Sequence, residues 1–326
     1  MIKARYLYLF VIILISTNSI AQKNTAYNYS TQKKLECRNG AVVSAHPLAS
    51  KAGVDILKQG GNAIDAAIAT QLALAVVYPG AGNIGGGGFM VTRLQNGQTL
   101  TLDYREKAPG KANRDMYLND KGEAQTDKSQ NGHLSSGVPG TIAGLFAAHK
   151  YAKLPFSKLI QPAIDLAEKG FVITEREASS LNNTQDEFRK YNTIMPVFVK
   201  DVPWKAGDTL VQKDLAATLK RIRDKGQKGF YEGKTAELIV AEMQRGKGII
   251  TLDDLKAYQA KWRTPMQFTY KGYKIVTMPL PSSGGIMLPQ MLKMVENEPL
   301  NQYGFHSLQS VQLMTEVERR AFADRA

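Results

Sequence analysis

The stretch that decides the fold runs from residue 60 to residue 90 and reads GGNAIDAAIATQLALAVVYPGAGNIGGGGFM. Asn62 is a helix-capping residue, and Ala63–Val77 consists almost entirely of Ala, Ile, Leu and Val. A helix that is apolar on most of its faces must be buried between layers of structure. Pro79 and Gly80 predict where it ends. The sequence therefore predicts a buried central helix that leads into a glycine-rich loop.

The four glycines at residues 85–88 are followed by a pattern that predicts a β-hairpin. Residues 89–94 and 99–105 are rich in strand-forming side chains, and Asn96-Gly97 between them is a strong hairpin-turn signal. A phosphate-binding loop needs Gly-Lys-Ser/Thr after its glycines, and a dinucleotide fingerprint needs strand, glycines and helix in that order. Neither pattern is present, which disfavours nucleotide binding. The glycines instead indicate backbone that passes close to another element or to a substrate.

The rest of the chain predicts helices and short strands around this centre. A short buried strand is expected at residues 40–45, and a polar loop or lid at residues 110–135. Thr251 has the character of a capping box and predicts a helix that runs towards Trp262. Further expected elements are helices at 49–59, 140–151 and 156–169, a mostly helical region at 175–262, a second hairpin at 268–278, and helices from about Ile286 and Leu308. Buried sheet combined with buried helices suggests stacked layers of both.

The first 21 residues have the pattern of a secretory signal peptide. Lys3 and Arg5 form a positive region, residues 6–15 form an apolar run too short for a membrane span, and Ser19-Ile20-Ala21 offers a cleavage site. The alternative is an uncleaved N-terminal anchor. Residues 22–39 are polar and are expected to be a flexible lead-in. No later stretch is apolar for long enough to cross a bilayer, so no stable membrane anchor is expected.

The composition excludes several classes of function. Of the 326 residues, 43% are hydrophobic and 22% are charged, as in an ordinary globular protein. The net charge of +13 is spread along the chain without a recognisable nucleic-acid module, so no nucleic-acid partner is expected. Cys37 is the single cysteine, which excludes an intrachain disulfide and leaves an incidental thiol. The four histidines are scattered, so neither a metal site nor a cofactor is expected.

Arg105 is the candidate binding residue. It is the last residue of the second strand of the first predicted hairpin, and a strand end gives a binding side chain a rigid base. The planar guanidinium can hold a carboxylate through two parallel hydrogen bonds. Taken alone, Arg105 could equally be a surface arginine that pairs with Glu106 or Asp103.

Five runs of sequence together resemble the gamma-glutamyltranspeptidase family. They occur in the order and at the intervals of that family and lie at residues 60–67, 79–90, 103–109, 136–141 and 278–285. The resemblance extends from about Gly40 to Ala326. Leu280 stands where the family usually has a proline, and the family pattern continues beyond the Ala-Asp-Arg at residues 323–325. The chain thus looks like the N-terminal, large-subunit portion of such a protein, covering residues 40–326, with the C-terminal small subunit absent.

The resemblance implies an α+β fold, a layered α-β-β-α sandwich of the N-terminal-nucleophile hydrolase type, present here as its large-subunit half. It implies a gamma-glutamyltransferase and glutathione hydrolase that forms a glutamyl-enzyme on the N-terminal threonine of the small subunit. Arg105 matches the arginine that binds the α-carboxylate of the substrate. The catalytic residues would all lie outside this chain. The implied partners are gamma-glutamyl substrates such as glutathione, amino acid or peptide acceptors, and the small subunit of the same precursor.

Two questions stay open at this point. The chain alone is expected to be inactive, and it is either half of an enzyme or a non-catalytic remnant that retains a glutamate-like anion site or a partner surface. The periplasm is the expected location, with full secretion as the alternative. The run Ser282-Ser283-Gly284-Gly285 resembles a large-subunit signature and is expected to pack near the subunit interface.

Overall fold

Helix α3 (Ala63–Val77) forms the centre of the computed structural model, which describes residues 34–326. Eleven of its fifteen residues are buried, and it packs against helices α2, α5 and α6. Asn62 caps it as predicted, because its side chain accepts hydrogen bonds from the N–H groups of Ile64 and Asp65. The predicted buried helix is confirmed. The predicted signal peptide at residues 1–21 and most of the lead-in at residues 22–39 lie outside the described residues.

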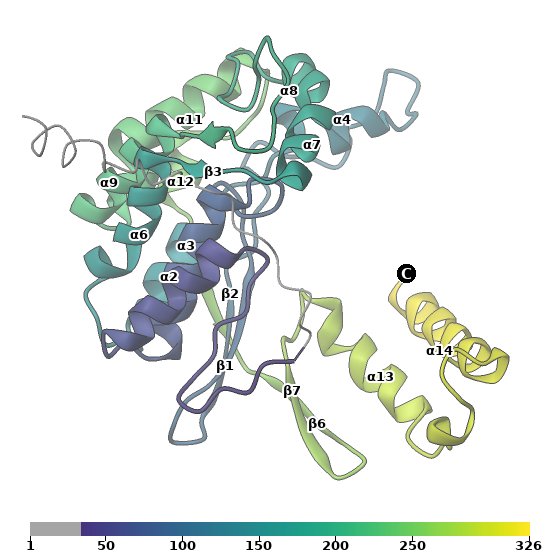
Figure 1. Ribbon diagram of the computed structural model, residues 1–326. Coiled ribbons are helices and arrows are strands. Elements are labelled where there is room, and N and C mark those ends of the chain that lie inside the picture. The colour runs from purple at the N-terminus through teal and green to yellow at the C-terminus, as the bar shows by residue number, and fades with distance from the viewer. Residues whose placement is uncertain (1–33) are drawn as a thin grey trace, which may run out of the picture.

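Helices are the main regular element of the described chain (Figure 1). The helices are α2 (Pro47–Lys58), α3, α4 (Thr126–Gln130), α5 (Thr141–His149), α6 (Phe156–Lys169), α7 (Glu175–Asn183), α8 (Gln185–Tyr191), α9 (Lys213–Lys225), α10 (Lys228–Tyr231), α11 (Gly233–Arg245), α12 (Leu252–Lys256), α13 (Met287–Met294) and α14 (Leu308–Arg325). Short 3-10 turns are η1 (His133–Ser135), η2 (Ser283–Gly285) and η3 (Leu300–Gln302). The strands are β1 (Phe89–Arg93), β2 (Thr99–Asp103), β3 (Phe171–Val172), β4 (Thr209–Leu210), β5 (Lys261–Arg263), β6 (Met266–Tyr270) and β7 (Tyr273–Thr277).

The largest sheet among residues 34–326 has three antiparallel strands in the order β1-β2-β5. The first hairpin is confirmed, and Gly97 at its turn has a positive φ of 84°. The second hairpin, β6–β7, is confirmed with its turn at Lys271 and Gly272. Helices α3 and α5 lie close to the first hairpin, and fully buried Leu102 of β2 belongs to the same core cluster as these helices. The α+β class is confirmed, and the four-layer sandwich stays a prediction.

Trp262 lies in a strand, so the prediction of a helix that reaches it was wrong. The capping box at Thr251 does begin α12, with Asp254 as its acidic partner, but the helix ends at Lys256. Trp262 then pairs with Leu102 across the β2–β5 ladder. Its ring also packs edge-on against Tyr151, with 5.3 Å between the ring centroids. The local sequence predicts where this helix begins but contains no signal for its end, and long-range strand pairing determines the conformation of Trp262.

The strand predicted at residues 40–45 is not formed. The exposure of the side chains alternates from Ala41 to Ala45, as in a strand, yet the segment has no strand partner among residues 34–326. Val43 is 92% exposed. A strand needs a neighbour for its backbone N–H and C=O groups, and strand-forming side chains alone cannot supply one. Residues 40–45 therefore show a local preference for strand conformation, but the part of the chain described contains no second strand that pairs with them.

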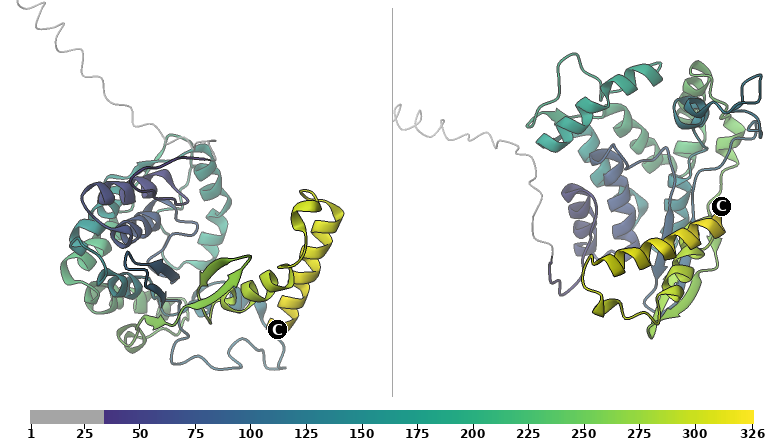
Figure 2. Two further views of the ribbon diagram at one scale, coloured as in Figure 1. Left: turned by 90° about the horizontal axis from the view of Figure 1, so that it is seen from below. Right: turned by 90° about the vertical axis from the view of Figure 1, so that its right-hand side faces the viewer.

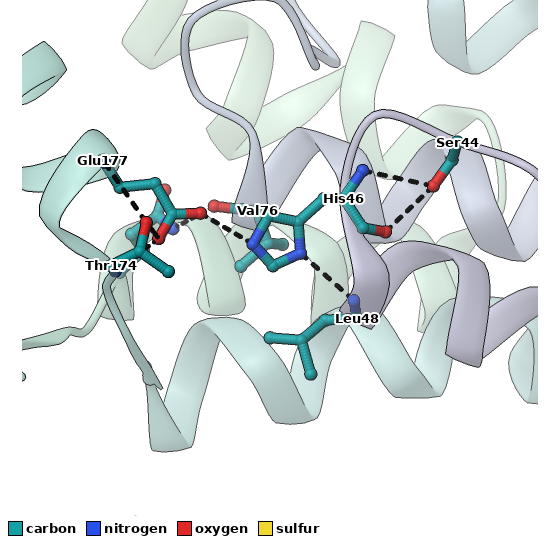
Figure 3. A network of polar contacts seen from close by, with 7 residues as sticks. Ser44, His46, Leu48, Val76, Thr174 and Glu177 are labelled. Atoms are coloured by element: carbon teal, nitrogen blue, oxygen red, sulfur yellow. Dashed lines mark hydrogen bonds and ion pairs between the residues drawn. The ribbon is translucent and has the colours of Figure 1, made fainter. Parts of the chain in front are cut away.

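A buried histidine ties the start of α2 to α7 (Figure 3). Nδ1 of His46 accepts the N–H of Leu48, so its proton lies on Nε2, which donates to Glu177 across 2.8 Å. Oε2 of Glu177 also accepts the N–H and hydroxyl of Thr174. Partial burial opposes the ionised carboxylate, but these hydrogen bonds outweigh it and lower the pKa of Glu177 to about 2. His46 is thus a structural histidine, as expected.

Residues 110–135 form turns, α4 and η1, and hydrogen bonds to helices α8, α11 and α12 hold this segment in place, the last from the N–H of Gly110 to Asp254. Nε2 of His133 lies 2.8 Å from Oε1 of Glu242 on α11. The hydroxyl of Tyr191 on α8 donates to Asp127. The predicted polar loop is confirmed apart from its short helix. No helix within residues 34–326 combines the length and the apolar character that a membrane span would need.

The hairpin β6–β7, α13 and α14 form a C-terminal arm that lies to one side of the helical body (Figures 1 and 2). Within the arm, α13 packs against β6 and α14. Nine large apolar side chains of the arm and its connecting loops are exposed: Met266, Tyr273, Leu280, Ile286, Phe305, Leu308, Val311, Met314 and Phe322. Such a concentration of exposed apolar side chains is typical of a surface that another polypeptide covers.

Candidate functional site

The glycine-rich loop after α3 is held by the N-terminus of α5. The carbonyl oxygen of Gly86 accepts the N–H groups of Gly140 and Thr141 at 2.7 and 3.0 Å. Oδ1 of Asn83 accepts the N–H of Gly86 and the hydroxyl of Thr141, both at 2.9 Å. These bonds satisfy donors that a helix start leaves without an internal partner. The loop therefore has a defined position against α5.

The same loop lies directly against the backbone of Arg105. Gly88 and Tyr104 exchange two backbone hydrogen bonds, at 3.3 and 3.0 Å, and so continue the β1–β2 ladder by one pair. A Cβ atom added to Gly87 would lie 2.5 Å from the carbonyl oxygen of Tyr104 and 2.8 Å from the Cα of Arg105. Glycine is needed here because two backbones cross too closely for any side chain. The sequence left open what the glycines approach, and the structure identifies backbone beside Arg105.

Arg105 has a fixed backbone and an exposed side chain. Its N–H donates to Oδ1 of Asp103 at 3.1 Å, and its carbonyl oxygen accepts the hydroxyl of Tyr258 at 2.7 Å. No hydrogen bond or ion pair reaches its guanidinium from within residues 34–326. A rigid backbone with an uncommitted guanidinium suits the capture of a carboxylate from outside.

The alternative of a surface ion pair for Arg105 does not occur in the described structure. Oδ2 of Asp103 instead accepts hydrogen bonds from Nε and Nη2 of Arg263, at 2.8 and 2.7 Å. Glu106 forms no ion pair with Arg105 among residues 34–326. The Asp103 side chain is 9% exposed and that of Arg263 is 34% exposed, so this pair is partly shielded from water.

Tyr258 is the second residue that holds Arg105 in place. It is 3% exposed, and burial together with the negative charges of Asp103 and Glu106 raises its pKa. The hydroxyl therefore keeps its proton and stays a donor to the carbonyl of Arg105. No sequence pattern pointed to Tyr258 or Arg263. Each lies more than 150 residues from Arg105, and no local pattern links them.

A cavity of about 800 Å³ borders the glycine loop. Its lining includes Gly82, Asn83 and Gly87 of the loop, Gln71 of α3, and the extended segment at residues 39–45. Gly87, whose backbone lies against that of Arg105, links the cavity to this residue, and Arg105 itself is not among the lining residues. Among residues 34–326, no group of three or more His, Cys, Asp or Glu side chains is arranged to hold a metal ion.

The sequence and fold of this chain are similar to those of known proteins. A family model described as gamma-glutamyltranspeptidase matches residues 49–326. The glutathione hydrolase proenzyme of Escherichia coli is 46% identical over 295 residues, which cover 90% of this chain and 51% of that protein. The glutathione hydrolase proenzyme of Bacillus subtilis is 42% identical over 310 residues, covering 93% of this chain and 52% of that protein.

Solved structures of the same family resemble this chain in fold. The crystal structure of Helicobacter pylori gamma-glutamyltranspeptidase superimposes with a TM-score of 0.87 at 47% identity, covering 90% of this chain and 84% of that chain. The transpeptidase CapD of Bacillus anthracis superimposes with a TM-score of 0.75 at 35% identity, covering 89% and 92%. The chain belongs to the gamma-glutamyltranspeptidase family. It spans about half the length of the curated relatives it matches.

Proposed function

We propose that this chain is the large-subunit half of a gamma-glutamyltransferase and glutathione hydrolase, and that Arg105 binds the α-carboxylate of the gamma-glutamyl donor. The observation that carries the proposal is the geometry of Arg105. Its backbone is held by Asp103 and Tyr258, and its guanidinium is uncommitted. A gamma-glutamyl group carries a free α-carboxylate, which a guanidinium fork recognises. Relatives that are 46% and 42% identical are named glutathione hydrolase proenzymes.

The proposed reaction uses a nucleophile from outside this chain. The hydroxyl of the N-terminal threonine of the small subunit attacks the gamma-glutamyl carbonyl carbon, and the α-amine of that threonine takes the proton. The amide C–N bond then breaks, and the leaving amine receives the proton. Water or the amino group of an acceptor amino acid or peptide next attacks the glutamyl ester and releases the threonine hydroxyl. In this chain, Arg105 would orient the donor throughout both steps.

Two features of the described structure support a partner polypeptide. The extended segment at residues 40–45 has unpaired strand character, and it lines the cavity beside the glycine loop. The C-terminal arm exposes nine large apolar side chains. A small subunit that adds strands next to residues 40–45 and covers the arm would complete the proposed four-layer sandwich. The same subunit would enclose Arg105, whose side chain is exposed here, and exclude water from its carboxylate pair.

Export to the periplasm, or full secretion, is part of the proposal. It is supported by the signal-peptide pattern at residues 1–21, which lie outside the described residues. Measuring the N-terminal residue of the protein recovered from the periplasm would test it, since cleavage after Ala21 would leave Gln22 at the N-terminus.

Donor kinetics test the function. The chain completed with a C-terminal half of the family should release the amine from a gamma-glutamyl anilide, whereas residues 1–326 alone should not. In the completed enzyme, Arg105→Ala should raise KM for the anilide by about 30-fold or more, because losing one partner of a desolvated charge pair costs about 2–5 kcal/mol. Arg105→Lys keeps the charge without the fork, so its KM should lie between the two. Unchanged kinetics in Arg105→Ala would remove this residue from the site.

A further inference from the structure

The carboxylate of Asp103 lies where it could compete with a substrate for Arg105. The β1–β2 ladder continues through Tyr104, so the chain is extended between Asp103 and Arg105. Residues two apart along an extended chain direct their side chains to the same side. An arginine beside a poorly hydrated carboxylate normally pairs with it. The absence of that pair between Asp103 and Arg105 in residues 34–326 needs a physical cause.

Arg263 supplies that cause by occupying Asp103 from the neighbouring strand. Its Nε and Nη2 both donate to Oδ2, at 2.8 and 2.7 Å, while Oδ1 is taken by the N–H of Arg105 at 3.1 Å. Strand β5 holds Arg263 in register opposite Thr101, whose buried hydroxyl donates to the carbonyl oxygen of Arg263 at 2.7 Å. Both oxygens of Asp103 thus have donors, and no hydrogen bond or ion pair joins either oxygen to the Arg105 guanidinium within residues 34–326.

We propose that Arg263 is a positioning residue that neutralises Asp103 and thereby leaves the guanidinium of Arg105 free to bind the donor carboxylate. This inference rests on the proposed function. Without Arg263, the partly buried charge of Asp103 loses its partner and attracts the flexible side chain of Arg105. The donor must then displace an internal carboxylate before it binds. KM for the donor rises, while kcat, which is set by the nucleophile in the other half, changes little.

Four variants of the completed enzyme test the inference: Arg263→Gln, Arg263→Lys, Asp103→Asn, and Asp103→Asn combined with Arg263→Gln. Arg263→Gln should raise KM for a gamma-glutamyl anilide roughly fivefold, the size of a partly screened ion pair. The double variant should return KM to that of Asp103→Asn, because an asparagine oxygen still accepts the N–H of Arg105 but carries no charge. Only competition by the Asp103 charge predicts that a second substitution restores affinity.

A donor analogue without the α-carboxylate separates this role from a structural one. Its KM should not respond to Arg263→Gln, since it makes no use of Arg105. Equal KM values for Arg263→Gln and the double variant would overturn the inference. So would an equal rise in KM for the gamma-glutamyl anilide and for the analogue without the α-carboxylate in Arg263→Gln. Should Arg263→Gln fail to fold, Arg263→Lys replaces it, because a lysine cannot pair with Asp103 through two hydrogen bonds and leaves its charge partly available to Arg105. Adding Asp103→Asn to Arg263→Lys must then lower KM for the donor. An unchanged KM in Arg105→Ala would instead reject the proposed function itself.

Discussion

The hydroxyl of Tyr258 donates a hydrogen bond to the carbonyl oxygen of Arg105, with 2.7 Å between the two oxygens. This contact joins residues that lie far apart in the sequence and holds the carbonyl of the candidate binding arginine, whose N–H is held by Asp103. Replacement of the tyrosine by phenylalanine removes one oxygen atom and keeps the ring. It therefore isolates what the contact contributes to the position of Arg105.

In the completed enzyme, Tyr258→Phe should raise KM for a gamma-glutamyl donor by about three- to tenfold, because the lost part-buried hydrogen bond is worth about 0.5–1.5 kcal/mol and its loss lets the chain shift. Steady-state kinetics measure the effect. Tyr231→Phe is a matched control, since the hydroxyl of Tyr231 donates to the carbonyl of Pro139 and is equally buried, but it does not contact Arg105. Tyr231→Phe should lower the melting temperature and leave KM unaltered. A rise in KM in both variants would show a general loss of packing.

The close crossing of the glycine loop predicts that Gly87 tolerates no side chain. The added Cβ of Gly87→Ala would meet backbone at 2.5 and 2.8 Å, and backbone cannot move aside as a flexible side chain does. The free energy of unfolding should fall by about 1–3 kcal/mol. Gly85→Ala is the control, because a Cβ there meets nothing within 4 Å. Denaturant melts of the two variants compare them directly, and equal stability would show that the crossing is looser than described.

Asp65 is a fully buried carboxylate that joins the start of α3 to the connection between α5 and α6. It accepts the backbone N–H groups of Asn62, Lys153 and Leu154, at 2.7, 2.9 and 2.9 Å. Asp65→Asn places an amide group against these donors and should lower the free energy of unfolding by about 2–3 kcal/mol. Asp55→Asn on the exposed face of α2 should change it by less than about 0.5 kcal/mol. Chemical denaturation measures both, and similar losses would contradict this role of Asp65.

Glu177 makes stability depend on pH. Its pKa is lowered from 4.5 to about 2 in the folded protein, so its contribution is complete above about pH 4.5 and is lost as the pH falls towards 2. Glu177→Gln should reduce the free energy of unfolding by about 1–3 kcal/mol at pH 7, through the lost hydrogen bonds from His46 and Thr174. The difference from the parent should shrink between pH 4.5 and pH 2. A constant difference across that range would show that the charge of Glu177 does not matter.

Much of the fold could be predicted because its signals are local. Asn62 caps α3 within three residues of itself, and Asn96-Gly97 determines the turn of the first hairpin. The placement of Arg105 at the end of the second hairpin strand followed from the same pattern, although the structure ends that strand two residues earlier, at Asp103. The family motifs were also sufficient for the family, which the comparisons then confirmed.

What the sequence by itself determined was the buried helix, the two hairpins and the choice of the candidate arginine, since caps, turns and periodicity act over a few residues. The tertiary structure decided that Trp262 joins a strand, that residues 40–45 find no partner in the described chain, and that Arg263 and Tyr258 hold the backbone and neighbours of Arg105. These outcomes depend on which distant surfaces come together. Contacts between residues more than 150 positions apart leave no periodic signal in either segment, because the sequence pattern of each segment reflects only its own local structure.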